Sequence, residues 1–319
     1  MSAWLPTAPC TPQLCAPRSG ATRRGTVAAS ARLLAGLGAV VAGILLVPVV
    51  ALFSAGRRDR LTSGWTRTVI RIFGLRIQVE GAPLAAPFTV PLDAPLTASP
   101  DAPGSGVLVV ANHISWLDIP LIATLFPGRV LAKSDIRRWP VLGLVAELGG
   151  TLFVDRDRLR ALPDTVRDVR DALRAGSRVI VFPEGSTWCG RDQGRFTAAM
   201  FQAALDAGAA VRPVRIGYRP LGPAAFVGDD PLAASLWRIV VARGLTAEIE
   251  VLPLIPAGRH PDRRSLARAA QSAVTHPDLA RTAPAHTTVA SDSANRPASS
   301  VHQRANSIPA PASSERTPS

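Results

Sequence analysis

The sequence has little cysteine, lysine or histidine. The shortage of cysteine limits the kinds of cross-link and metal site that the chain can form. Three cysteines occur in 319 residues: Cys10 and Cys15 in a proline-rich N-terminal stretch, and Cys189 in the patterned part of the chain. This spacing supports neither a disulfide scaffold nor a four-ligand zinc site. We therefore interpret Cys189 as a packed or incidental thiol, and the cysteine usage is compatible with a reducing compartment.

The scarcity of lysine means that arginine carries the positive charge. Lys133 is the single lysine in a chain of net charge +13 and pI near 11.4. Such a charge suits nucleic acid, anionic lipid headgroups or phosphorylated substrates, and a genome rich in G and C is the alternative explanation of the arginine bias. The arginines are spread along the chain and are not interleaved with aromatic residues on one element, so we expect no nucleic-acid partner.

Composition divides off the two ends of the chain. Residues 1–30 and 276–319 lack periodicity, and we expect both to be disordered tails. Between them, 31–56 contains an uncharged apolar run at 33–53, long enough to cross a hydrocarbon core of ~30 Å. A secretory signal peptide fits less well, because its apolar region spans about 7–15 residues and ends at a small-residue cleavage site. Pro48 leaves a bent or re-entrant anchor open beside a simple span.

The remaining chain is long enough for one globular domain, which we place at 62–275. Its first stretch, 62–74, mixes apolar residues with arginine, and it fits an interfacial membrane helix and an ordinary packing helix equally well. Residues 82–105 are rich in proline and alanine and are expected to form a surface insertion. Arginines flank both ends of the apolar run, so the positive-inside rule leaves its orientation open.

Short apolar runs alternate with helical patterns through this domain. Strands are predicted at 75–80, 107–112, 129–133, 151–155, 178–182, 211–218 and 247–252. Helices are predicted at 117–126, 137–148, 158–175, 197–208, 231–243 and 262–274. This alternation predicts an α/β fold with a largely parallel or mixed sheet flanked by helices.

The first candidate site is the sequence NHISWLD at 112–118, directly after a predicted strand. His113 is the one histidine inside the patterned region, and Asp118 follows five residues later. Histidine can accept a proton near neutral pH, and a carboxylate on one ring nitrogen fixes the tautomer that leaves the other free. Five residues on a continuous helix would turn the two side chains about 140° apart, so the pair needs a loop-to-helix break near Ser115. Asn112 and Ser115 are either helpers of the pair or caps.

The second candidate site is FPEGST at 182–187, which also ends a predicted strand. It offers Glu184, the flexible Gly185 and the hydroxyl of Ser186. Backbone N–H groups in a glycine-containing turn can form an anion-binding concavity. A plain turn explains this motif equally well in isolation, but the carboxyl ends of strands in such sheets are the usual place for ligands.

Four motifs in order resemble one known family. NHISWLD, GGTLFVDR at 149–156, FPEGST and VRPVRI at 211–216 are similar to the four blocks of the glycerolipid acyltransferases, the 1-acyl-glycerol-3-phosphate acyltransferase family. The match covers about 65–255, and AKSDIRRWPVLG at 132–143 is similar to the family's segment between the first two blocks. A membrane-associated N-terminus is usual in that family.

The resemblance implies an enzyme that moves a fatty acyl group from acyl-CoA or acyl carrier protein to a free hydroxyl. His113 would take the proton from the acceptor hydroxyl, and Asp118 would orient the imidazole. Neither an acyl-enzyme, nor a metal, nor a cofactor is implied. In the second block, Arg156 would bind the acceptor phosphate through its planar guanidinium, while Glu184, Gly185 and Ser186 would shape the acceptor pocket.

The acceptor stays open. Members acting on lysophosphatidate commonly carry a basic residue after an aromatic one beyond the third block, whereas Thr197 follows Phe196 here. Arg191 or Arg195 could replace that contact. Phosphatidate synthesis from 1-acyl-glycerol-3-phosphate is the first hypothesis, another acceptor such as lyso-ornithine lipid or a lysophospholipid the second, and a non-catalytic lipid-binding membrane protein the third. Acyl thioesters are made in the cytoplasm, so we expect the site to face it from the cell membrane.

Overall fold

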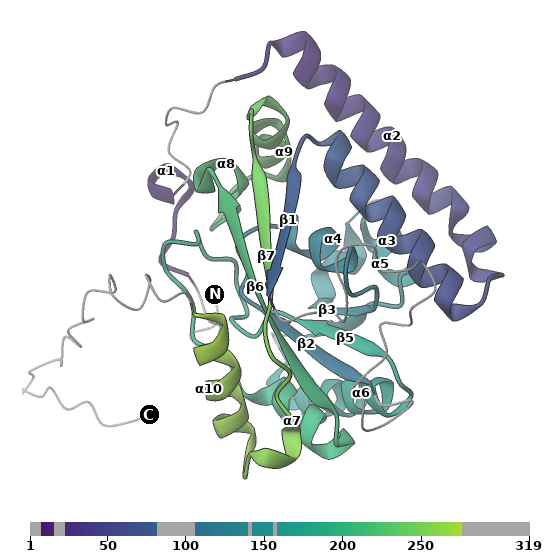
Figure 1. Ribbon diagram of the computed structural model, residues 1–319, viewed down its shortest axis with the longest axis vertical. Helices are drawn as coiled ribbons and strands as arrows, with labels where there is room; N and C mark the ends of the chain where they lie inside the picture. The colour runs from purple at the N-terminus through teal and green to yellow at the C-terminus, as the bar shows by residue number, and fades with distance from the viewer. Residues whose placement is uncertain (1–7, 16–22, 82–105, 140–141, 156–157, 276–319) are drawn as a thin grey trace, which may run out of the picture. The chain divides into compact units, whose positions relative to one another are not determined.

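The protein is described by a computed structural model for residues 8–15, 23–81, 106–139, 142–155 and 158–275. At its centre lies a seven-stranded sheet with the order β1-β7-β6-β2-β5-β3-β4 (Figure 1). The strands are β1 (Arg76–Gly81), β2 (Val107–Ala111), β3 (Arg129–Lys133), β4 (Leu152–Val154), β5 (Arg178–Val181), β6 (Ala210–Arg219) and β7 (Thr246–Val251). All of the predicted strands are confirmed, each to within one residue at either end.

The sheet is mixed, as expected: among its described strands, β6 and β7 pair antiparallel. β2, β3, β4 and β5 run parallel to one another, and β6 runs parallel to β2. β1 is added at the far edge, parallel to β7. The carboxyl ends of five strands therefore meet at the same edge of the sheet, and both candidate motifs begin there.

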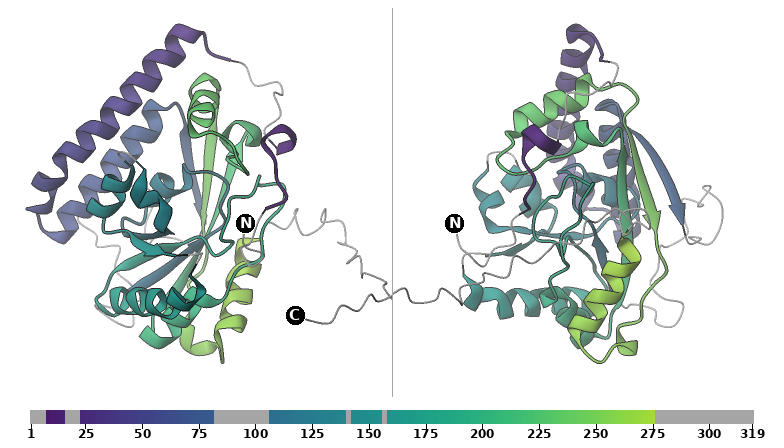
Figure 2. Two further views of the ribbon diagram at one scale, coloured as in Figure 1. Left: turned by 180° about the vertical axis from the view of Figure 1, so that it is seen from behind. Right: turned by 90° about the vertical axis from the view of Figure 1, so that its left-hand side faces the viewer.

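Helices cover both faces of the sheet (Figures 1 and 2). Because side chains alternate along a strand, Val109 and Ala111 of β2 enter the core on one face and Leu108 and Val110 the core on the other. The first face is covered by α3 (Ala55–Ile72), α4 (Asp118–Ala123), α8 (Leu221–Ala224) and α9 (Leu232–Val241). The second is covered by α6 (Leu162–Arg174), α7 (Ala199–Ala207) and α10 (Arg263–Val274). The shorter helices are α1 (Pro12–Cys15), α5 (Leu142–Leu148), η1 (Ser134–Arg138), η2 (Leu159–Ala161) and η3 (Ala257–Arg259).

The N-terminal region carries more structure than its composition predicts. The apolar segment is α2 (Thr26–Ala51), which runs as one helix through Pro48. The expectation of a disordered stretch at 1–30 is wrong for 8–15 and 23–30, because α1 forms and its cysteines are buried, and because α2 already begins at Thr26. Residues 1–7 and 16–22 lie outside the described residues, as do the predicted insertion at 82–105 and the predicted tail at 276–319.

Two glycines let α2 approach α3 closely. A Cβ at Gly36 would lie 2.6 Å from the ring of Phe73, and a Cβ at Gly43 would lie 2.3 Å from the ring of Trp65. The indole of Trp65 donates a hydrogen bond to the carbonyl of Ala39 at 3.1 Å. The stretch 62–74 therefore packs against α2 and the core, as the packing interpretation expects. An 18-residue window of α2 has a mean hydropathy of 2.6 and only 6% of that window is buried, so by length and composition α2 can cross a membrane.

Candidate active site

The site begins where β2 ends, and Asn112 determines how the chain leaves the sheet. Its side-chain amide donates to the carbonyl of Ile216 at 2.9 Å, and its side-chain oxygen accepts the N–H of Ile216 at 2.8 Å. Asn112 therefore extends the pairing of β2 with β6 by one more residue. His113, the next residue, is released from the sheet at a defined point.

His113 and Asp118 meet as their spacing requires. Nδ1 of His113 lies 2.8 Å from Oδ2 of Asp118, the first residue of α4. The same oxygen accepts the N–H groups of Ile114 at 2.6 Å and Ser115 at 2.9 Å, so the carboxylate folds the loop back onto the start of the helix. The Oγ of Ser115 accepts the N–H of Leu117, the N-cap residue of α4, so Ser115 helps to hold the turn before the helix. The predicted loop-to-helix break is confirmed.

The two members of the pair differ in exposure. The side chain of Asp118 is fully buried, whereas that of His113 is 18% exposed. Among the described residues, Asp118 is the side chain that hydrogen-bonds the His113 ring, and no serine or cysteine is bonded to it. The arrangement can therefore accept a proton from an incoming hydroxyl, and it does not resemble a base that activates an enzyme nucleophile.

Two further residues contact the pair: Phe182, the first residue of the FPEGST motif, and Tyr218, and the sequence analysis assigned a role to neither. Phe182 stacks its ring on the imidazole of His113, with centroids 4.1 Å apart and planes 20° apart. The hydroxyl of Tyr218 donates to Oδ1 of Asp118 at 2.6 Å. Burial and the charge of Asp118 raise the pKa of Tyr218 well above its ordinary value, so its hydroxyl remains a donor. Tyr218 is the single tyrosine of the chain, and it lies on β6 just after VRPVRI. These two features are the sequence signals that could have indicated it.

Glu184 holds the loop that carries His113 from inside the protein. Its side chain is 1% exposed; Oε2 accepts the backbone N–H of His113 at 2.8 Å and Oε1 accepts that of Gly194 at 3.1 Å. Burial raises the pKa of Glu184 to about 8. The two N–H groups act to lower this pKa, and the charge of Asp118 adds to the rise. The family resemblance implies a substrate-binding role. In the structure both oxygens accept hydrogen bonds from the chain's own backbone, so we propose that Glu184 positions the loop of His113, and its part in acceptor binding stays a prediction.

The rest of the FPEGST turn is held by local hydrogen bonds. Gly185 has a φ of +72°, a conformation that favours glycine, and its N–H donates to the carbonyl of Phe182 at 3.1 Å. Thr197 donates its hydroxyl to the carbonyl of Pro183 at 2.8 Å, so the residue that departs from the family pattern secures this turn. Ser186 is half-buried beside them, and its role in acceptor binding stays a prediction.

The phosphate contact predicted for Arg156 falls on a residue that the structure does not describe. Arg156 lies outside the described residues; the strand before it, β4, ends at the same sheet edge as β2 and β5. The alternative cations, Arg191 and Arg195, are both exposed on the loop that leads to α7. Lys133 ends β3 at this edge and forms an ion pair with Asp135.

Comparison with known proteins agrees with this geometry. A model of the family described as Acyltransferase matches residues 89–217. A lyso-ornithine lipid O-acyltransferase of Pseudomonas aeruginosa is 37% identical over 221 residues, which make up 68% of this chain and 78% of that protein. The chain belongs to the acyltransferase family.

One further sequence relative and one solved structure are also similar to this acyltransferase. A 1-acyl-sn-glycerol-3-phosphate acyltransferase of Neisseria gonorrhoeae is 38% identical over 174 residues, 53% of this chain and 67% of that protein. The crystal structure of the 1-acyl-sn-glycerophosphate acyltransferase of Thermotoga maritima has the same fold, with a TM-score of 0.57 and 19% identity, over 78% of this chain and 92% of that one. The enzyme class expected from the four blocks is confirmed, as is the α/β fold.

Proposed function

We propose that this acyltransferase moves a fatty acyl group from acyl-CoA or acyl carrier protein to the free hydroxyl of a lyso-lipid. The observation that carries the proposal is the pairing of the partly exposed His113 with the buried Asp118. A carboxylate bonded to Nδ1 keeps the proton on that nitrogen and leaves Nε2 as the acceptor. No acyl-enzyme and no cofactor enters the proposal.

The steps follow from that geometry. Nε2 of His113 takes the proton of the acceptor hydroxyl as its oxygen attacks the thioester carbonyl, and a C–O bond forms. The tetrahedral intermediate collapses with cleavage of the C–S bond, and the departing thiolate takes the proton back from His113. The fixed charge of Asp118 stabilises the imidazolium between the two transfers.

The first acceptor we propose is 1-acyl-glycerol-3-phosphate, with phosphatidate as the product. The match of Arg156 to the family's second block supports it, because a planar guanidinium suits phosphate. The name of the Neisseria gonorrhoeae relative supports it as well.

A second acceptor, lyso-ornithine lipid, is favoured by Thr197. The family's lysophosphatidate pattern has a basic residue at this position, and here the hydroxyl is bound to the carbonyl of Pro183. The relative named for lyso-ornithine lipid also aligns with a larger share of this chain than the one named for the glycerol phosphate.

One experiment tests chemistry and acceptor together. The purified full chain receives a labelled acyl-CoA, or the same acyl chain on acyl carrier protein, with lysophosphatidate, lyso-ornithine lipid, a lysophospholipid or no acceptor. We expect label in one lyso-lipid, and none with His113→Ala beyond about a thousandth of the wild-type rate. Transfer that survives His113→Ala would contradict the mechanism. Absence of transfer to every acceptor would favour the non-catalytic lipid-binding alternative.

We further propose that α2 holds the enzyme at the cell membrane with its site facing the cytoplasm, where acyl thioesters are made. The exposed apolar surface of α2 supports membrane association. Beside its N-terminal end, Arg24, Arg32, Arg76 and Arg243 line a cavity of about 460 Å³ that has no acidic residue in its lining. Such a cluster suits the anionic headgroups of the cytoplasmic leaflet.

A further inference from the structure

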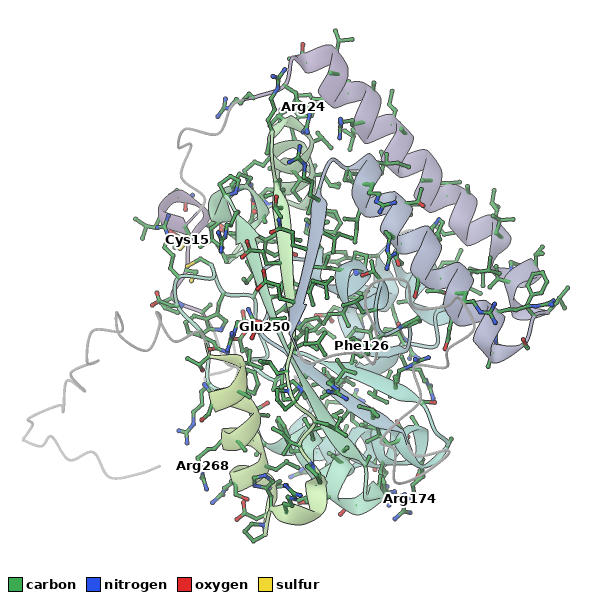
Figure 3. All side chains as sticks on the ribbon, in the orientation of Figure 1. Cys15, Arg24, Phe126, Arg174, Glu250 and Arg268 are labelled. Carbon is green, nitrogen blue, oxygen red and sulfur yellow. The ribbon has the colours of Figure 1, made fainter. Side chains whose placement is uncertain are left out.

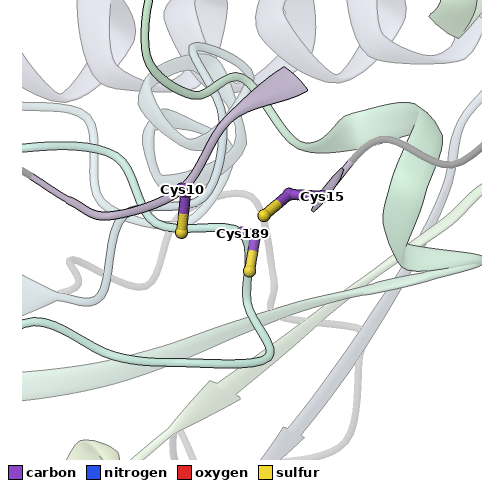
Figure 4. A group of neighbouring side chains, drawn as sticks. All are labelled: Cys10, Cys15 and Cys189. Carbon is purple, nitrogen blue, oxygen red and sulfur yellow. The ribbon is translucent and has the colours of Figure 1, made fainter. Parts of the chain in front are cut away.

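All three cysteines of the chain come together in one place. Cys10 precedes α1, Cys15 is the last residue of α1, and Cys189 lies in the loop after β5. Their sulfur atoms all lie within 4.8 Å of one another, and none of the three is in a disulfide (Figure 4). All three are buried. Cys189 is thus a packed thiol, one of the two interpretations that the sequence allowed, and its neighbours come from a segment far away in the sequence.

Packing alone is a weak explanation for this convergence. The cluster around the thiols is small, with Ala225 and Val227 as its other buried members. Any small apolar side chain would fill such a space, yet a chain with three cysteines in 319 residues places all of them here. A disulfide would use two of the thiols and leave the third without a partner. One metal ion would use all three.

We propose that Cys10, Cys15 and Cys189 form a three-thiolate site for a thiophilic cation, zinc(II) in the first place, with solvent in the fourth position. Zinc binds thiolate sulfur at about 2.3 Å, so the sulfurs on one tetrahedral ion lie roughly 3.8 Å apart. The three sulfurs all lie within 4.8 Å of one another, so they exceed that spacing by at most about 1 Å. Thiolates select zinc and copper(I) over the oxygen-seeking calcium and magnesium.

The backbone around one of the three sulfurs suits a bound thiolate. The N–H groups of Arg191 and Asp192 hydrogen-bond the sulfur of Cys189, so donors already surround one of the proposed ligands. Binding zinc to three thiols releases three protons and involves no oxidation.

The site would join the N-terminal segment to the loop that supports the catalytic base. The residue before Cys189, Trp188, donates its backbone N–H to the carbonyl of His113 at 2.7 Å. Further along the same loop, Gly194 donates to Glu184, which in turn holds the N–H of His113. An ion bound to Cys189 would therefore hold segment 8–15 against this loop. Its role would be structural, distinct from the proposed acyl transfer.

The test measures zinc on the whole protein. The full chain, purified in detergent with its thiols reduced, is incubated with zinc chloride, dialysed and assayed for metal and for free thiols. We expect about one zinc per chain, and its loss in Cys10→Ser, Cys15→Ser and Cys189→Ser. Val227→Ala is the matched control, since it disturbs the same cluster without removing a ligand and should keep the metal. His113→Ala should keep the metal while losing acyl transfer, which separates this site from the proposed function.

A second measurement does not depend on how well the serine variants fold. Cobalt(II) added to the reduced wild-type chain should give a thiolate-to-cobalt charge-transfer band, and zinc should displace it. Removing zinc from the wild type with a chelator should lower Tm, and adding zinc back should restore it. The proposal is overturned if the reduced wild type binds no zinc, if the serine variants bind as much as the wild type, or if two of the thiols are found joined in a disulfide.

Discussion

The hydroxyl of Tyr218 lies 2.6 Å from Oδ1 of Asp118, on the opposite oxygen from the one that holds His113. The two oxygens of Asp118 accept hydrogen bonds from different donors. Oδ1 accepts from Tyr218, and Oδ2 accepts from the imidazole and from the N–H groups of Ile114 and Ser115. A carboxylate with no exposed surface needs all of these donors. Tyr218 therefore stabilises the charge of Asp118, which in the proposed mechanism orients His113 as the base.

We expect Tyr218→Phe to weaken both stability and turnover. The change leaves Oδ1 of Asp118 buried without its donor, which should lower the free energy of unfolding by about 1.5–3 kcal/mol. The rate constant kcat should fall while KM for the acceptor stays the same, because Tyr218 acts through Asp118. Denaturant unfolding and steady-state kinetics measure the two effects. Thr124→Val, which removes another buried hydroxyl from the same helical region, is the control and should lower stability alone. Equal kinetic losses in both variants would contradict the assignment.

Asp118→Asn should be far more harmful to catalysis than to folding of the sheet. An amide at this position can present an N–H to His113, and the proton would then lie on Nε2, where the acceptor hydroxyl needs a free lone pair. The expected loss in kcat is up to about 10⁴-fold, the order seen when the carboxylate partner of a catalytic histidine becomes an amide. Asp230→Asn, which breaks the buried ion pair with Arg238, serves as a control for the loss of a buried carboxylate. A kcat loss in Asp118→Asn no larger than in the control would contradict the orienting role.

Glu184 should make the stability of the enzyme fall as the pH rises. Its pKa in the folded protein, about 8, lies above the ordinary value of 4.5, so between these values the folded chain retains a proton that the unfolded chain has released. Raising the pH through this window favours unfolding, by up to about 1.4 kcal/mol per pH unit, and the effect levels off above pH 8. Unfolding curves between pH 5 and 9 should show this slope in the wild type and lose it in Glu184→Gln.

The same variant separates positioning from substrate binding. Glu184→Gln weakens the hold on the backbone of His113, so kcat should fall by up to about 100-fold with KM for the acceptor little changed. Glu147→Gln removes an exposed carboxylate and should change neither the kinetics nor the pH slope of stability. A raised KM with intact kcat in Glu184→Gln would restore the substrate-binding role that the family resemblance implies.

Sequence periodicity predicted the sheet well, for a physical reason. Strands such as β2 and β5 are buried on both faces and read as short apolar runs between turns, so their limits are visible locally. The N-terminal region was harder, because α1 is short and its cysteines are buried by partners from a distant loop. Local composition carries no information on such a contact, and a stretch rich in proline and alanine looked disordered.

In the candidate site, too, the sequence predicts contacts between neighbouring residues and misses contacts between distant ones. The pairing of His113 with Asp118 depends on five neighbouring residues and a helix start, so it could be predicted. Tyr218 reaches Asp118 only because β6 lies next to β2, and nothing near Tyr218 in the sequence marks that neighbour. The contact of the buried Glu184 carboxylate with the backbone N–H of His113 joins residues that are far apart in the sequence, so no local pattern indicated it.

The arginine cavity beside the N-terminal end of α2 predicts a salt-sensitive attachment to anionic membranes. Burial and the charges of Arg32 and Arg243 lower the pKa of Arg24, which shows how closely these cations are held together. Arg24 lies at the end of the molecule opposite Arg174 on α6 (Figure 3). Replacing the exposed Arg76 and Arg243 with glutamine should weaken binding to vesicles containing phosphatidylglycerol by about five-fold for each arginine removed, with no change on phosphatidylcholine vesicles.

The matched control for that experiment is the double change Arg167→Gln and Arg174→Gln, which removes the same charge from α6. A general effect of net charge would weaken anionic binding equally in both double variants, and the cavity would then have no special part in it. If the cavity binds the membrane, vesicle binding should be weakened in the Arg76 and Arg243 double variant and not in the control. The difference should become smaller as salt is raised, because exposed charges are screened within about 10 Å at 0.1 M ionic strength. Vesicle co-sedimentation at two salt concentrations distinguishes these outcomes, and the exposed apolar residues of α2 should keep some binding in every variant.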